Sequence, residues 1–71
     1  MASDICIRLG SRIRELRKNA GWTQMYLSVH TGLSRTFISD VELGRKEPCL
    51  RSIEILAIAF DLTVGELLSG V

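Results

Sequence analysis

The stretch from Thr31 to Glu42, TGLSRTFISDVE, decides the fold of this chain. Gly32 suits the left-handed backbone of a tight turn, and Ser34 suits the cap of a helix that follows it. Within that helix Ile38 and Val41 recur at helical spacing and predict its buried side. The stretch therefore predicts a turn followed by a short amphipathic helix.

The outward side of this predicted helix is polar. The helix is expected to run from Arg35 to Leu43, with Gly44 as its stop. Its outward hydrogen-bonding side chains are those of Arg35, Thr36, Ser39 and Asp40. These groups are too few and too mixed in charge for solubility alone, so they predict a surface that contacts a partner.

A second short helix, covering residues 24 to about 30, is predicted before the turn. Thr23 is a good N-cap, and Trp22 is placed to pack on Leu27 as a hydrophobic staple. Two short helices joined by a turn around Gly32, the second polar outside, form the pattern of a helix-turn-helix. In that motif the second helix lies in the DNA major groove.

Apolar residues at steps of three and four predict a longer helix near the N-terminus. Its stripe consists of Ile5, Leu9, Ile13, Leu16 and Ala20. Ser3 or Asp4 caps its start, and residues 19–21 end it. Gly10 inside it costs about 1 kcal/mol relative to alanine, so we expect a close backbone approach there.

Two further helices are predicted after Pro48, which prevents an earlier start. The first covers residues 50 to about 60, with an apolar stripe of Ile53, Leu56, Ala57 and Phe60. Thr63 caps the second, and Glu66 completes a capping box. Five short helices without strands predict an all-α fold, and the length predicts a single domain over residues 1–71.

Charge is distributed unevenly along the chain. Residues 5–51 hold all nine Lys and Arg against four acidic residues, a balance of +5. Residues 52–71 hold three acidic residues and no basic one, a balance of −3, and Asp4 supplies the remaining −1. This asymmetry fits a face for a polyanion, although a solvated charged surface explains it equally well.

Composition disfavours several classes of function. The two cysteines lack metal-ligand spacing and His30 is the only histidine, so we expect free buried thiols, no metal and no cofactor. The N-terminus carries no signal segment, and the longest apolar run, residues 55–60, is too short to cross a bilayer. These features predict a cytoplasmic protein. No nucleophile–base pair or phosphate loop is visible, so no catalytic residue is assigned and an enzyme is not expected.

The apolar content of 46% exceeds what one small core requires. The surplus falls at residues 50–71, which we predict to be a dimerisation region. The predicted interface residues are Ile55, Ile58, Ala59, Leu62, Val64, Leu67, Leu68 and Val71. Exposed apolar patches usually mark an interface, and twofold symmetry is the commonest arrangement, so we expect a homodimer.

The order and spacing of these features resemble the phage-repressor and Cro-type helix-turn-helix family, also called the XRE family. The shared pattern, over residues 10–68, is Ile13-Arg14-x-Leu16-Arg17, Gln24-x-x-Leu27, Gly32-Leu33-Ser34, Ile38-Ser39-x-Val41-Glu42-x-Gly44 and Pro48. The resemblance implies a compact five-helix lambda-repressor-like domain with its helix-turn-helix at about 23–44. Residues 35–39 are also similar to the recognition helix of restriction-modification controller proteins.

The resemblance implies roles for particular residues. Arg35, Thr36 and Ser39 match base-reading positions, with Asp40 adjacent. Gln24 matches a glutamine that typically binds a phosphate and braces the recognition helix. Apart from the resemblance, Thr23 and Ser34 are candidates for contacts with the DNA backbone, and Arg45 and Lys46 for contacts with the backbone or the minor groove. Arg17 and Glu42 match a salt bridge between the first and third helices. The chain departs from the family at Ser28, where alanine is usual, and at Leu43, where asparagine or arginine often contacts the DNA backbone.

The chemistry of the polar face agrees with base reading. An arginine fork fits O6 and N7 of guanine, and threonine offers its methyl to thymine. Asp40 could accept from cytosine N4, but a carboxylate near phosphates more often excludes wrong partners or orients Arg35. Arg12, Arg14 and Lys18 either add charge toward DNA or lie in solvent. Trp22 and Tyr26 either stack on bases or pack internally, and packing is the favoured role.

Double-stranded DNA is therefore the expected partner, bound by a homodimer at a palindromic operator, with no small-molecule ligand evident. An autoregulatory restriction-modification controller is one form of this function. The alternative is a protein-interaction module on the same fold, such as an antitoxin or assembly adaptor. Such modules usually carry a disordered tail that wraps their target, and Val71 follows directly on the last predicted helix. We therefore favour the DNA-binding regulator.

Overall fold

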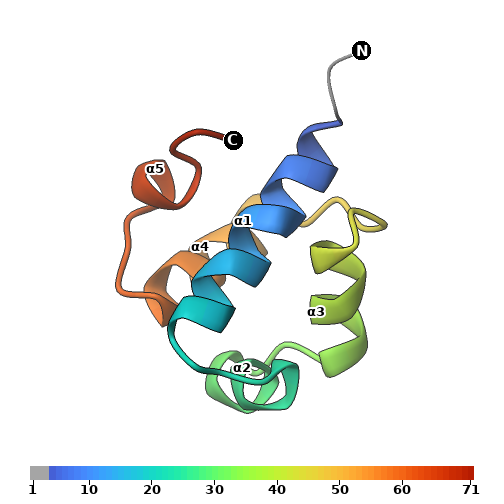
Figure 1. Ribbon diagram of the computed structural model, residues 1–71, viewed down its shortest axis with the longest axis vertical. Helices are drawn as coiled ribbons and strands as arrows, with labels where there is room; N and C mark the ends of the chain where they lie inside the picture. The colour runs from blue at the N-terminus through green and yellow to red at the C-terminus, as the bar shows by residue number, and fades with distance from the viewer. Residues whose placement is uncertain (1–3) are drawn as a thin grey trace.

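The computed structural model describes residues 4–71, which form five helices and no strand (Figure 1). The helices are α1 (Ile5–Asn19), α2 (Gln24–Thr31), α3 (Arg35–Glu42), α4 (Leu50–Ala59) and α5 (Val64–Leu67). The predicted all-α fold is confirmed. The predicted ends are correct to within one residue. The sequence placed Leu43 and Phe60 inside α3 and α4, whereas they are the C-caps of these helices.

Side-chain caps fix where the helices begin. The Asp4 carboxylate accepts a hydrogen bond from the backbone N–H of Cys6 at 2.7 Å, and Ser3, the other predicted cap, lies outside the described residues. Thr23 and Ser34 accept from the third residue of α2 and α3, each at 3.0 Å. Thr63 and Glu66 form the predicted capping box of α5. Local sequence chemistry therefore sets these four boundaries.

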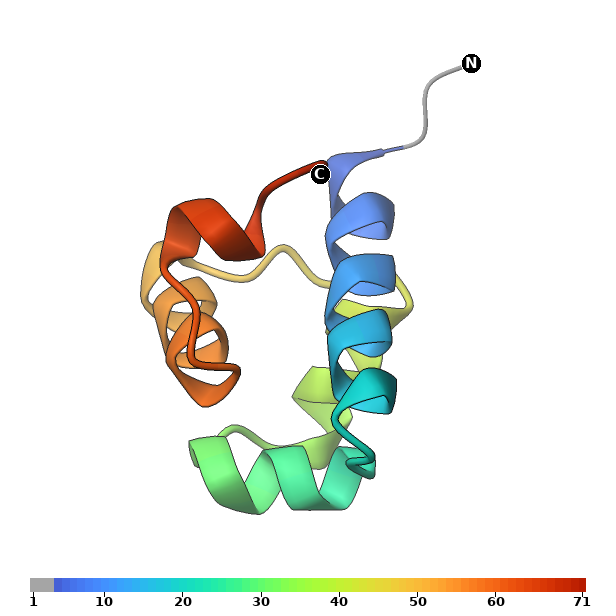
Figure 2. The same cartoon turned by 60° about the vertical axis from the view of Figure 1, so that its left-hand side comes forward.

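The helices are arranged around one core, and α1 packs chiefly along α3. In Figure 1, α3 lies on one side of α1 and α5 on the other, and Figure 2 shows α4 and α5 together across from α1. Residues of α1 pack along α3, and residues of α2 pack along both α3 and α4. This arrangement leaves the outer side of α3 open to solvent on the side of the molecule away from α5.

A small core joins all five helices. Its buried apolar residues are Leu9, Ile13, Leu27, Ile38, Val41, Leu56, Ala57 and Leu67. The stripe predicted for α1 is buried only in its middle, because Ile5 is 59% exposed and Ala20 is also exposed. Both lie at the ends of α1, beyond the helices that cover its centre.

One predicted interface residue is wrong. Leu67 is 0% exposed and belongs to the core of the monomer, so it is not available to a second subunit. Leu67 packs in the same core cluster as Leu9 of α1 and Leu56 of α4. Leu62, Val64, Leu68 and Val71 are only partly covered by the core.

Two arginines of α1 hold the C-terminal segment. Arg12 donates from Nε to the carbonyl of Leu67 at 3.1 Å and from Nη2 to the carbonyl of Glu66 at 3.2 Å. Arg8 donates from Nε to the carbonyl of Val71 at 3.1 Å. These bonds attach α5 and the residues after it to α1. Arg12 therefore has a structural role, which the sequence left open.

Gly10 lies where α1 meets the end of α3, as predicted. A Cβ atom on Gly10 would lie 2.3 Å from the carbonyl oxygen of Val41 and 2.6 Å from that of Glu42. These neighbours are backbone atoms, which cannot rotate aside as a side chain can. Glycine at this position therefore permits the close contact of α1 and α3.

We predict that Gly10→Ala lowers the free energy of unfolding by about 1–3 kcal/mol, because the clash outweighs alanine's better helix propensity. Gly65→Ala is the matched control, since the nearest atom to its new Cβ is Thr63 Oγ1 at 3.9 Å. The control should be neutral or stabilising by up to about 1 kcal/mol. Urea unfolding followed by circular dichroism measures both, and equal stability of the two variants would contradict the close packing.

Candidate nucleic-acid interface

The four predicted base-reading side chains lie together on the outer side of α3. Arg35 and Thr36 are exposed, whereas Ser39 and Asp40 are half-buried. All four line one shallow surface depression, which we call the reading surface. Ser34 caps the helix just before them, so its first turn is fixed where Arg35 and Thr36 project. The reading surface combines a cationic fork, a methyl group, two hydroxyls and a carboxylate, groups that can distinguish base edges.

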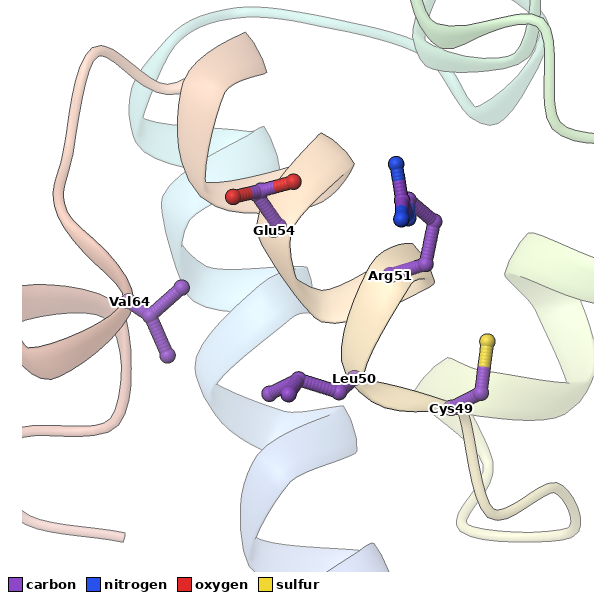
Figure 3. A pocket seen from close by; sticks show the side chains of 5 residues that line it. All are labelled: Cys49, Leu50, Arg51, Glu54 and Val64. Atoms are coloured by element: carbon purple, nitrogen blue, oxygen red, sulfur yellow. The ribbon is translucent and has the colours of Figure 1, made fainter.

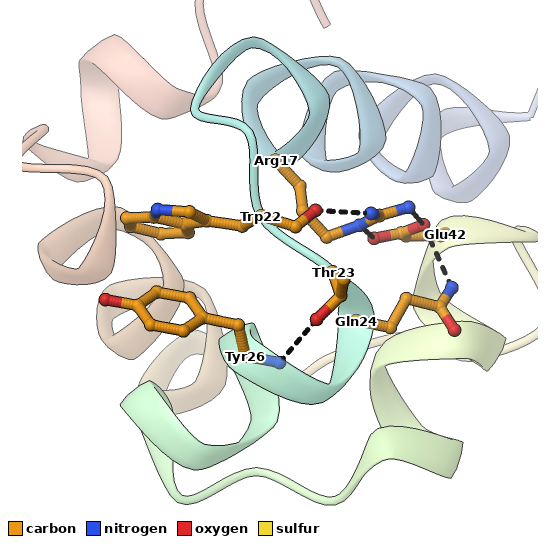
Figure 4. Close-up of polar contacts among 6 residues, drawn as sticks. All are labelled: Arg17, Trp22, Thr23, Gln24, Tyr26 and Glu42. Atoms are coloured by element: carbon orange, nitrogen blue, oxygen red, sulfur yellow. Dashed lines mark hydrogen bonds and ion pairs between the residues drawn. The ribbon is translucent and has the colours of Figure 1, made fainter.

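The predicted Arg17–Glu42 ion pair is present and fixes α3 to α1. Arg17 donates from Nε to Glu42 Oε2 at 2.7 Å and from Nη2 to Oε1 at 3.0 Å (Figure 4). Its Nη1 donates to the carbonyl of Trp22 at 2.8 Å, which lies between α1 and α2. A bidentate pair of this kind constrains direction as well as distance. The orientation of α3 is thereby tied to α1.

Gln24 extends this network to α2. Its Nε2 donates to Glu42 Oε1 at 3.1 Å (Figure 4). The bracing role implied for Gln24 is therefore present, and its second Nε2 proton remains for another acceptor. A phosphate contact by Gln24 stays a prediction.

Because the ion pair is buried, each charge depends on its partner for hydrogen bonds. Arg17 and Glu42 are each only 9% exposed. The hydrogen bond to Glu42 raises the pKa of Arg17, outweighing the opposite effect of desolvation. Among residues 4–71, no buried side-chain nitrogen or oxygen lacks a hydrogen-bond partner. The charged groups are thus fully satisfied as long as both partners remain.

The remaining backbone-contact candidates lie at exposed positions around α3. Thr23 is exposed at the start of α2, and Ser34 is exposed at the start of α3. Arg45 and Lys46 are exposed in the loop that follows Gly44. The structure describes all four as surface residues, and their contacts with DNA stay predictions.

Ser28 has a structural role that the sequence did not reveal. Its hydroxyl donates to the carbonyl of Leu33 at 2.6 Å, across the turn between α2 and α3. Thr31 donates to the carbonyl of Leu27 at 2.7 Å and accepts from the N–H of Leu33 at 3.2 Å. Serine in place of the usual alanine therefore adds a bond that holds the turn. A hydroxyl next to a Gly-containing turn is the signal from which this bond could have been predicted.

Trp22 packs inside the molecule. Its ring stacks on Phe60 at a centroid distance of 5.2 Å and lies 5.0 Å from the ring of Tyr26. Tyr26 also stacks on His30 at 5.7 Å, while both remain exposed at their edges. This cluster joins α2 to the end of α4, as the favoured packing role predicts.

The two thiols differ from the prediction. Both cysteines are free, but Cys49 is exposed at the N-cap of α4 and only Cys6 is partly buried. Cys49 Sγ lies 3.4 Å from Ser52 Oγ, and this hydrogen bond lowers the pKa of Cys49. Cys49 is exposed because the loop before α4 carries it outward while Pro48 takes the buried position.

No helix within residues 4–71 has the length and apolar character needed to span a membrane. Within the same residues, no three His, Cys, Asp or Glu side chains are grouped as ligands of a metal ion would be.

The chain belongs to the helix-turn-helix domain family, whose model matches residues 8–69. It is 30% identical over 70 residues to the control protein C.MunI of a Mycoplasma species, covering 97% of this chain and 95% of that protein. It is 35% identical over 65 residues to the HTH-type transcriptional regulator DdrOP3 of Deinococcus deserti, covering 92% of this chain and 50% of the regulator. The resemblance to repressor and controller proteins is thus confirmed.

Solved structures agree with this assignment. The restriction-modification controller protein C.AhdI from Aeromonas hydrophila superposes with a TM-score of 0.83 at 37% identity, covering 87% of this chain and 94% of that one. The chain spans only 40% to 50% of the length of three curated relatives, DdrOP3 among them. Those relatives therefore extend well beyond the part that corresponds to this chain.

We predict that Glu42→Ala lowers the free energy of unfolding by about 3–5 kcal/mol, because it leaves the buried Arg17 charge unpaired. Glu15→Ala is the control, since Glu15 is 64% exposed and lies 3.7 Å from Arg12 on the helix surface. The control should cost only about 0.2–1 kcal/mol. Chemical unfolding measures both changes, and a Glu42→Ala effect as small as that of Glu15→Ala would refute the structural role of the pair.

Proposed function

We propose that this chain is a sequence-specific regulator of transcription that binds double-stranded DNA as a homodimer at a palindromic operator. The observation that carries the proposal is the reading surface, whose four polar side chains project from a helix fixed by a buried ion pair. A rigid helix with exposed hydrogen-bonding groups at its N-terminal half is what major-groove reading requires. The regulator names of the relatives support it as well.

Each residue of the reading surface has a proposed role. Arg35 donates to O6 and N7 of guanine, and Thr36 contacts a thymine methyl. Ser39 donates or accepts, and so reads less strictly. Asp40 either accepts from cytosine N4 or orients Arg35. Gln24, Thr23, Ser34, Arg45 and Lys46 hold the DNA backbone and set the register.

The proposed dimer surface is the outer side of α4 together with the segment around α5. Ile58 is 69% exposed and Leu50 is 74% exposed, at opposite ends of α4. A hollow beside the start of α4 is lined by Leu50 and Val64, with Arg51 and Glu54 among its other residues (Figure 3). Leu50 is part of this proposed surface although it was not among the predicted interface residues, whereas the buried Leu67 is not part of it. An exposed apolar side chain next to an open hollow suits a self-complementary contact.

The arrangement of helices is compatible with such a dimer. Because α3 and α5 lie on opposite sides of α1, a second copy on α4 and α5 would leave both reading surfaces uncovered (Figure 1). Successive major grooves on one side of DNA are about 34 Å apart. The proposed dimer places one α3 in each. Acidic Asp61 and Glu66 lie at its rim, where screening weakens their repulsion, whereas Glu54 lines the hollow together with Arg51.

Within this class we propose an autoregulatory restriction-modification controller, since relatives with that description match nearly their whole length. The family consists of helix-turn-helix DNA-binding regulators, so the proposal assigns no catalytic role. A regulator of DNA works where the DNA is, which makes the cytoplasm the proposed location. The protein-interaction module is less favoured, because its target would leave the reading surface unexplained.

Selection of bound duplexes from a random pool, followed by footprinting, tests the proposal directly. The expected result is a palindromic sequence protected over two half-sites whose centres lie one helical turn apart. Recovery of no enriched sequence, with binding no tighter than to bulk DNA, would contradict sequence-specific regulation. The operator selected in this way is the duplex on which binding by the variants is measured.

We predict that Arg35→Ala weakens binding to the selected operator by about 1–3 kcal/mol and relaxes the preference at one base pair. Lys46→Ala should instead weaken all sequences alike and reduce the salt slope by about one unit. Fluorescence anisotropy with the operator and a random duplex separates the two effects. If Arg35→Ala weakens both duplexes equally, Arg35 holds phosphate and not a base.

We predict that Ile58→Asp turns the dimer into a monomer, because it places a charge within the apolar contact. Val29→Asp is the matched control, since Val29 is 77% exposed on α2, outside the proposed dimer surface. Sedimentation at micromolar concentration should show a dimer for the wild type and the control, and a monomer for Ile58→Asp. A monomeric wild type, or an Ile58→Asp variant that dimerises normally, would contradict the proposed interface.

A further inference from the structure

A second surface depression adjoins the reading surface. It is lined by Arg14, Arg17, Gln24, Ser39, Glu42 and Leu43, and so brings together α1, α2 and α3. Ser39 lines both depressions, which places the second one directly beside the residues that face a base edge in the proposed complex. A DNA strand next to the reading surface would therefore pass over it.

This depression carries one positive charge that the fold does not use. Arg17 is neutralised by Glu42 and donates its remaining bond to the carbonyl of Trp22. Arg14 is exposed, and within residues 4–71 its guanidinium has no hydrogen bond or ion pair. Arg12, two residues earlier, differs because it is held by the carbonyls of α5. Of the α1 arginines beside α3, Arg14 is thus the one left for an external anion.

The other residues that line this depression limit the kind of ligand that it can bind. Leu43 is 54% exposed and has no hydrogen-bonding group in its side chain. Gln24 gives one Nε2 proton to Glu42 and keeps the second. An anion in the depression would be met by the Arg14 guanidinium and this amide N–H, a combination that suits a phosphate oxygen.

We propose that Arg14 of α1 binds a phosphate of the DNA backbone in this depression, next to the strand that α3 reads. The contact lies outside the helix-turn-helix itself. It is independent of base sequence, and it fixes the depth and register of α3 in the groove through α1. This inference rests on the proposed function, because it requires that DNA covers the reading surface.

The test compares Arg14→Ala, Arg14→Lys and Val29→Asp with the wild type, using the selected operator and a random duplex over a series of salt concentrations. Arg14→Ala should lower the slope of log K against log salt by about one unit and weaken both duplexes about fivefold to tenfold at about 0.1 M salt. Arg14→Lys keeps the charge and should keep most of the slope. Val29→Asp also lowers the net charge by one, at an exposed position of α2 outside the reading surface and the proposed dimer surface, and should leave the slope unchanged.

The outcomes separate the inference from the proposed function. A wild type that binds no DNA overturns the proposed function and this inference with it. A wild type that binds normally, with Arg14→Ala indistinguishable from Val29→Asp, overturns the inference alone. A loss confined to the selected operator also overturns it, because Arg14 would then read a base. Thermal unfolding of Arg14→Ala should match the wild type, so that a binding loss is not a folding loss.

Discussion

The buried pair of Arg17 and Glu42 is the interaction on which the rest of the structure depends. Burying two charges is tolerable here because Arg17 and Glu42 share two hydrogen bonds. Gln24 gives Glu42 a further bond, and the Trp22 carbonyl accepts one from Arg17. Those four bonds connect α1, α2 and α3 at one point. Gly10 permits the same contact, since any larger residue would push α1 off the end of α3. The direction in which the reading surface points follows from this junction.

The basic side chains divide into those that build the molecule and those that face outward. Arg8 and Arg12 bind carbonyls at the C-terminal end of the chain, and Arg17 belongs to the buried pair. Exposed basic side chains on or beside α3 are those of Arg14, Arg35, Arg45 and Lys46. The excess of positive charge in residues 5–51 therefore includes basic side chains that bond within the protein and basic side chains that face outward. Only the outward ones are available to a polyanion. Net charge alone could not have separated them.

Sequence reasoning succeeded where a feature depends on a few neighbouring residues or on one required backbone shape. The four helix caps, the left-handed Gly32 and the tight contact at Gly10 are of this kind. The sequence did not predict burial or bonding that depends on which helices pack against one another. Leu67 was taken for a surface residue because periodicity shows that a residue is apolar without showing what packs on it. Arg12 and Ser28 were missed for the same reason, because their partners are carbonyls that the fold brings close.

The central claim is that α3, held by the buried pair, reads base edges in the major groove. Methylation interference on the selected operator tests it most directly, because methyl groups on guanine N7 lie in the major groove and those on adenine N3 lie in the minor groove. The account predicts that N7 methylation blocks binding in two half-sites about 34 Å apart, while N3 methylation between them has little effect. Interference confined to the minor groove, or none at guanine N7 in either half-site, would contradict it.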